Sequence, residues 1–242
     1  LGRLEGSLDA ASLGPEGFVI RTRGRQIFIA GPTPRGTLYG CSAFLESLGV
    51  RWFTPKVTFT PRQPSLSVPP TDLADRPAFE YREPFIFEAF DKDWAARNRV
   101  NGHRPNLDDS TGGKVGYAQF VHTLDTFIPP TLVDTHPEYF PLIDGRRTGG
   151  YVQRCLTNPD VLRLAIDGVR RSFQDHPDAG ICSVSQNDCA SWCTCDACRK
   201  LTEQYGSHSG LYLWFVNQVA AAVEKDLPDK LIDTLAYQFT EA

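Results

Sequence analysis

The chain has 242 residues, of which 41% are hydrophobic and 22% are charged, and its formal net charge is −4. These values are ordinary for a globular protein with one large domain or two smaller ones. Both signs of charge are mixed along the chain without a basic run, which argues against nucleic acid as a partner. No apolar run approaches the ~20 residues of a membrane-spanning helix.

The sequence contains no Met, so Leu1 is not an initiator residue. Its last residues, 235–242, stop just after a strand-like run. We therefore expect an interior piece of a longer protein. A signal peptide could precede such a piece, so these ends leave the compartment open.

Residues 17–55 predict a small α+β layer with a supporting role. Apolar and polar side chains alternate over residues 18–22 and 26–30, with a hairpin signal between them. Helical spacing follows over residues 36–48, and residues 50–53 return as a strand. Residues 61–77 are rich in Pro, Ser and Asp, as in a linker. We place the domain boundary here, with a first domain over residues 1–75 and a second over residues 76–242.

The second domain alternates predicted strands with predicted helices. Asn158 caps a helix with Pro159 at its first position, and Ser209 caps a later one. The strands are expected at residues 85–88, 120–122, 154–157, 181–184 and 232–237. This order predicts an α/β fold with a parallel sheet covered by helices. About five units fit, which suggests a partial (β/α)₈ TIM-like barrel truncated after its fifth strand, although a doubly wound open sheet gives the same local pattern.

The stretch over residues 179–188 stands out. Ile181, Cys182 and Val184 form a short apolar strand that stops at polar residues and ends in Asp188. A buried strand that ends in a carboxylate places that group at the carboxyl edge of a sheet. This is the edge at which α/β folds bind their ligands.

Several motifs carry a resemblance to known families. The runs FVI, IFIAG, GTLYG and LESLGVRWF, which end at Phe53, resemble the N-terminal α+β domain that precedes the barrel in α-glucuronidases and β-hexosaminidases. The rest resembles a bacterial family of uncharacterised, glycoside-hydrolase-like barrel proteins. That resemblance covers HPEYF at 136–140, CLTNP at 155–159, SVSQND at 183–188, WCTCDAC at 192–198, FVN at 215–217 and TLAYQ at 234–238.

The resemblance implies a barrel and a carbohydrate substrate. In related barrel glycosidases the proton donor lies at the end of the fourth strand, and Asp188 ends the strand that we count as the fourth. Trp192 could supply an apolar wall that raises the pKa of such a donor. The structural alternative is that Asp188 caps the following loop.

Four further residues are candidate sugar contacts. His122 closes the second predicted strand, and Asn187 and Tyr237 stand at the ends of the fourth and fifth. Arg82 could bind a hydroxyl or a uronate carboxylate through its forked donors. Each of these side chains could instead be a structural hydrogen-bonding or core residue. Glu241 is a weaker candidate for the second carboxylate.

The seven cysteines gather late in the chain. Cys41 and Cys182 lie in apolar periodic segments and are expected to be buried thiols. The spacing of Cys189, Cys193, Cys195 and Cys198 would allow a closed structural zinc site with four sulfur ligands. A disulfide and unligated thiols are the alternatives.

We therefore expect a glycoside hydrolase, or a related protein, that cleaves a glycosidic bond by general acid catalysis. It would need no cofactor beyond a possible structural zinc. The alternatives are a non-catalytic carbohydrate-binding protein on a barrel scaffold and a zinc-stabilised interaction domain. A role in degrading polysaccharides would favour export to the periplasm or the medium.

Overall fold

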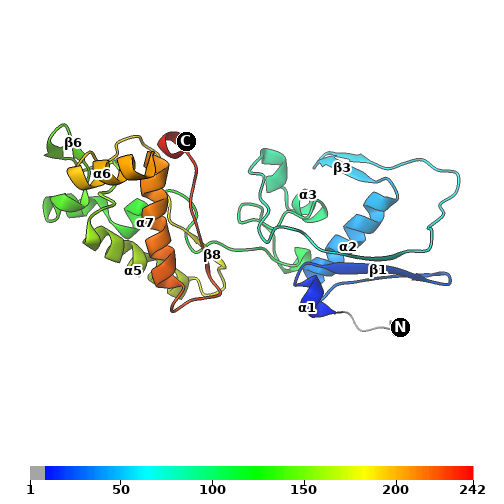
Figure 1. The fold of residues 1–242 in the computed structure, drawn as a ribbon. Helices are drawn as coiled ribbons and strands as arrows, with labels where there is room; N and C mark the ends of the chain where they lie inside the picture. The colour runs from blue at the N-terminus through cyan, green and yellow to red at the C-terminus, as the bar shows by residue number, and fades with distance from the viewer. Residues whose placement is uncertain (1–8, 242) are drawn as a thin grey trace. The chain divides into compact units, whose positions relative to one another are not determined.

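The structure is a computed structural model that describes residues 9–241, in two compact units that divide after Val115 (Figure 1). The boundary expected near residue 75 falls inside the first unit. Strand β5 (Asp72–Asp75) pairs with β1 (Phe18–Arg23), and the buried amide of Asn101 donates to the Glu16 carboxylate at 2.7 Å. These contacts hold the chain beyond the proline-rich segment to the N-terminal sheet.

The first unit is built on an antiparallel sheet with the strand order β2-β1-β5. The predicted hairpin is confirmed as β1 and β2 (Gln26–Ala30). Helix α2 (Pro34–Ser47) begins at Thr33, whose hydroxyl accepts from the Gly36 amide. It packs on the sheet at Gly40, where an added Cβ would lie 2.7 Å from Ile29, so the close approach requires glycine.

The remaining elements of the first unit are short. The predicted strand at residues 85–88 is wrong, because this run forms the 3-10 helix η1 (Phe87–Phe90) and its apolar side chains are exposed. The predicted strand at residues 50–53 is confirmed as β3 (Arg51–Thr54). The other elements are α1 (Ala10–Leu13), β4 (Val57–Phe59), α3 (Lys92–Arg97) and η2 (Asp109–Thr111).

The second unit is a helical layer beside a parallel strand pair. Strands β8 (Ile181–Ser183) and β9 (Leu231–Asp233) pair in parallel, and helices α6 (Asp196–Tyr205) and α7 (His208–Val223) connect them. Helix α5 (Pro159–Asp175) precedes β8 and lies beside α7 (Figure 1). The smaller elements are α4 (Leu124–Phe127), η3 (Pro130–Asp134), η4 (Pro137–Tyr139), β6 (Leu142–Ile143), β7 (Arg146–Arg147) and η5 (Gln238–Thr240).

Local signals located the two long helices well. The Asn158 side chain accepts from the amides of Asp160 and Val161, which confirms the predicted cap of α5. Helix α7 buries the predicted apolar face, but Ser207 caps it instead of Ser209. No helix in the described part of the chain has the length and apolar character needed to cross a membrane.

The partial barrel stays a prediction. Tyr117 bridges Ile181 in parallel, so residues 116–119, β8 and β9 lie as three parallel segments in a row. The predicted strand at 120–122 is wrong, because these residues form no strand and the parallel bridge lies before them at Tyr117. The predicted strand at 154–157 is wrong, because this segment turns directly into the cap of α5. Among the described residues, the sheets have two or three strands each and no barrel closes.

Candidate functional site

Four cysteine sulfurs converge in the second unit. The Sγ atoms of Cys155, Cys193, Cys195 and Cys198 all lie within 4.8 Å of one another. Cys155 Sγ is 3.8 Å from that of Cys195 and 3.9 Å from that of Cys198. Three of the four side chains are buried and Cys195 is half-buried. Such a set of sulfurs can hold one metal ion.

Two separate segments bring these sulfurs together, because Cys155 lies on one and the other three cysteines lie within residues 193–198. Cys155 lies just before the cap of α5, and its amide donates to the Tyr139 carbonyl. Cys195 is the N-cap of α6, and Cys198 lies in the first turn of that helix. Cys193 lies beside the β6–β7 hairpin, where its sulfur accepts from the Leu142 amide at 3.3 Å.

Polar groups surround the sulfurs. The Arg147 guanidinium lies 3.7 Å from the Cys193 sulfur, and the Thr157 hydroxyl lies 3.3 Å from that of Cys198. Hydrogen bonding with Cys193 and Cys198 lowers the pKa of Cys155, and the hydrogen bond with Cys155 raises the pKa of Cys193 to about 11.

The structure corrects the cysteine assignments. Cys189 is outside the group, because its sulfur contacts the Gln153 amide at 3.3 Å, and Cys155 takes its place. Cys41 is exposed instead of buried. Cys182 is buried as expected, and burial raises the pKa of its thiol to about 12.

Asp188 lies at the carboxyl edge of the parallel segments. Residues Ser185, Gln186 and Asn187 are buried, and Asp188 is the first exposed residue after β8. Its Oδ1 accepts from the Gln238 side chain at 2.7 Å, and its amide donates to the Tyr151 hydroxyl at 3.0 Å. The carboxylate is thus fixed at the surface by a residue that follows β9.

Asn187 was expected to contact a sugar, but its side chain is buried and has a structural role. Its side-chain amide donates to Asp125 at 2.5 Å and to the Val152 carbonyl at 2.7 Å. Asp125 also pairs at 2.7 Å with Arg154, whose side chain is completely buried. This network positions the strand end from inside, so Asn187 cannot contact a bound sugar.

His122 and Tyr237 meet at the same edge. The His122 Nδ1 lies 2.8 Å from the Gln186 carbonyl, and the Gln186 side chain donates to the Tyr237 carbonyl at 2.7 Å. The two rings lie 5.9 Å apart, with His122 half-buried and Tyr237 37% exposed. The structure therefore brings His122, Tyr237 and Asp188 together around Gln186.

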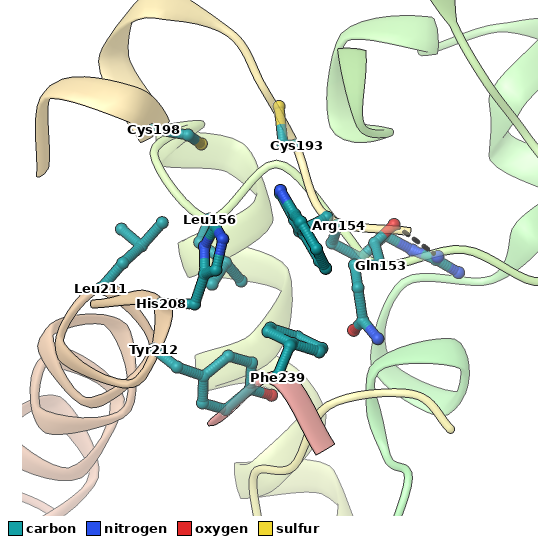
Figure 2. A pocket seen from close by; sticks show the side chains of 10 residues that line it. Gln153, Arg154, Leu156, Cys193, Cys198, His208, Leu211, Tyr212 and Phe239 are labelled. Atoms are coloured by element: carbon teal, nitrogen blue, oxygen red, sulfur yellow. Dashed lines mark hydrogen bonds between the residues drawn. The ribbon is translucent and has the colours of Figure 1, made fainter. Parts of the chain in front are cut away.

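Trp192 does not provide the expected wall for a sugar site. Its ring packs on His208 and Phe239, with centroid distances of 4.5 and 5.5 Å. Figure 2 shows the small cavity that these residues border, between Tyr212, Arg154 and the cysteines. Its volume is about 20 Å³, which holds about one water and no sugar ring.

Comparison with known proteins adds the family. Residues 52–242 match the model of the domain of unknown function DUF4838. The chain belongs to this family. No curated protein and no solved structure matches the chain. The DUF4838 match includes the whole second unit, and therefore both the cysteine group and the Asp188 edge.

Arg82 lies within the DUF4838 match but serves the packing of the first unit. Its guanidinium pairs with Glu16 at 2.7 Å and donates to the Arg99 carbonyl at 2.7 Å and the Tyr39 hydroxyl at 3.2 Å. These contacts engage the donors that were expected to bind substrate. We therefore leave Arg82 out of the site.

Sequence reasoning missed four residues of these two sites: Cys155, Arg147, Tyr151 and Gln238. One available signal was the Asp144-Gly145 pair, a strong two-residue hairpin turn, which places Arg147 on β7. Cys155 was hidden by the expectation of a strand at 154–157. Tyr151 lies in a loop and Gln238 begins the single-turn helix η5, and neither place has a periodicity that marks a functional residue.

Proposed function

We propose that this protein binds carbohydrate at the carboxyl edge of β8 and β9 and cleaves a glycosidic bond there, with Asp188 as the proton donor. The observation that carries this proposal is the position of Asp188. It is exposed directly after a buried strand end, and Gln238, which begins η5 after β9, orients its carboxylate.

The side chains around Asp188 suit a sugar. Tyr151 and Tyr237 are 58% and 37% exposed, and both are near Asp188 or its partner Gln238. Together with half-buried His122, they offer apolar ring faces with polar tips. A sugar presents apolar C–H faces and a rim of hydroxyl groups, which such amphipathic rings can contact.

Asp188 presents an exposed carboxylate, and the neutral side-chain amide of Gln238 donates to it and orients it. A glycosidase needs such an acid to protonate the leaving oxygen. We assign no catalytic role to Asp125, because Arg154 and Asn187 engage it.

The parallel unit β8–α6–α7–β9 supports the partial (β/α)₈ barrel as part of the proposal, because strand–helix–strand units are the repeat of that fold. The resemblance to barrel glycosidases also favours Asp188 as the proton donor. A non-catalytic carbohydrate-binding protein is the competing function, and the experiment below separates the two.

The test is a screen of the complete natural protein against aryl glycosides and uronides, followed by Asp188→Asn. With a poor leaving group, we expect a loss in kcat of about 100-fold or more, as for removal of a general acid. With a nitrophenyl leaving group the loss should be much smaller, because that group departs without protonation. Asp178→Asn is the matched control, since Asp178 is exposed just before β8, at the opposite end of the strand.

An Asp188→Asn variant with unchanged turnover on both classes of substrate would remove Asp188 from the mechanism. If no glycoside is cleaved but a sugar binds, and Tyr237→Ala abolishes that binding, the carbohydrate-binding alternative is correct. If no sugar binds or reacts, both functions are excluded for the panel that was tested.

A further inference from the structure

The separations in the cysteine group match a single tetrahedral ion. Four sulfurs at about 2.3 Å from one zinc ion lie about 3.8 Å from one another. Cys155 Sγ lies 3.8 and 3.9 Å from its two nearest recorded sulfur neighbours, and the whole group lies within 4.8 Å. Disulfide sulfurs would lie at about 2.05 Å. The group is therefore arranged for coordination and not for cross-linking.

Hydrogen bonds from the surrounding backbone hold the Cys193 sulfur in place. The Leu142 amide donates to the Cys193 sulfur, and the Thr194 amide and hydroxyl both bond the Leu142 carbonyl, at 2.9 and 2.6 Å. This double link fixes the turn around Cys193 against the hairpin. In metal sites, residues outside the ligand shell hydrogen-bond the ligands and fix their orientation.

Positive groups around the four sulfurs would offset the negative charge of a metal–thiolate centre. Four thiolates around one divalent ion leave a net charge of −2, which is costly in a buried place. Arg147 lies 3.7 Å from the Cys193 sulfur, and α6 directs the positive end of its dipole toward Cys195 and Cys198. The half-buried Arg147 is thus placed where a metal–thiolate centre needs a cation.

We propose that Cys155, Cys193, Cys195 and Cys198 bind one zinc ion in a closed structural site. The four sulfurs complete the tetrahedron and leave no open position for a substrate. The ion would join the segment before α5 to residues 193–198 at the start of α6, and the Leu142 amide links that stretch to the β6–β7 hairpin. This inference goes beyond the glycosidase proposal and does not depend on it.

The first measurement is the metal content of the full chain, purified under reducing conditions with zinc. We expect one zinc per chain, and X-ray absorption with four sulfur neighbours at about 2.3 Å. Cobalt substitution should give the intense visible absorption of a tetrahedral thiolate site. Iron in place of zinc, or sulfur neighbours accompanied by nitrogen or oxygen, would contradict the assignment.

The ligand set is tested by the choice between Cys155 and Cys189. Cys155→Ser should reduce the bound zinc at least 10-fold, whereas Cys189→Ser should leave one zinc per chain. Loss of zinc in the Cys189 variant alone would overturn the proposal. Cys41→Ser serves as a second control, because Cys41 is exposed in the first unit.

Cys155→Ser could also fail to fold, so alkylation mapping of the unaltered chain provides an independent reading. Zinc should protect the four ligand cysteines from alkylation, while Cys41 and Cys189 are alkylated. A strong chelator should make the four ligand cysteines reactive as well. The chelator should also lower the midpoint of thermal unfolding by about 10 °C, since metal binding contributes directly to folding. Reaction of all four ligands in the presence of zinc, or their recovery as disulfides, would refute the site.

Discussion

The Sγ atoms of Cys155 and Cys195 lie 3.8 Å apart, although 40 residues separate the two cysteines in the chain. Helix α5 and strand β8 lie between them in sequence. The cysteine group is therefore formed by the tertiary structure of the second unit. The residues around it should affect zinc binding.

Arg147 should control the affinity for zinc. Its guanidinium is 3.7 Å from the Cys193 sulfur and donates to the Phe140 carbonyl at 2.7 Å. Arg147→Gln removes the nearby cation, and we expect zinc affinity to fall about 10–100-fold, as for other outer contacts of metal sites. Competition with a chromophoric chelator measures the change.

The matched control is Arg146→Gln, in the same strand β7 but with an exposed side chain. It should leave zinc affinity unchanged within about twofold at physiological salt, where exposed charges are screened. Equal losses in the two variants would show that net charge, and not the contact with Cys193, sets the affinity.

The ion pair between half-buried Asp125 and buried Arg154 should be important for stability. The Arg154 side chain is fully buried against Phe140, and its Nη2 lies 2.7 Å from the Asp125 carboxylate. Asp125→Ala leaves that charge unpaired, and we expect the free energy of unfolding to fall by about 3 kcal/mol. Urea unfolding followed by circular dichroism gives the value.

Asp160→Ala is the control, because Asp160 pairs with Arg163 on the exposed face of α5. Its cost should stay below about 1 kcal/mol. Replacing both Asp125 and Arg154 by apolar residues should recover much of the lost stability, since no unpaired charge remains. A double variant that is no more stable than Asp125→Ala would rule out this explanation.

His208 should make the second unit less stable in mild acid. Burial lowers the pKa of this ring below 6.5, and it packs on Trp192 with a centroid distance of 4.5 Å. The folded state then binds fewer protons than the unfolded state, so this contribution to stability is complete above pH 6.5. It is lost as the pH falls through the lowered pKa.

Titration of His208 by NMR should give a midpoint below 6.5. His208→Gln should flatten the decline in unfolding free energy in that range, while His176→Gln, which changes an exposed His, should not. A His208 midpoint at or above 6.5 would contradict the burial argument.

Local patterns in the sequence determined much of the second unit. Asn158 and Pro159 located the start of α5, and helical spacing located the buried face of α7, because caps and amphipathic faces depend on neighbours within one or two turns. The same holds for Asp188, whose place at the end of β8 follows from an apolar run of three or four residues.

The sequence did not determine which side chains face inward at that edge or which cysteines meet. Asn187 and Asp188 are adjacent, yet one is buried against Asp125 and the other is exposed. Cys189 is close to Cys193 in the chain, but Gln153 contacts it elsewhere and Cys155 joins the group instead. Contacts between distant segments decide such choices, and only the tertiary structure contains them.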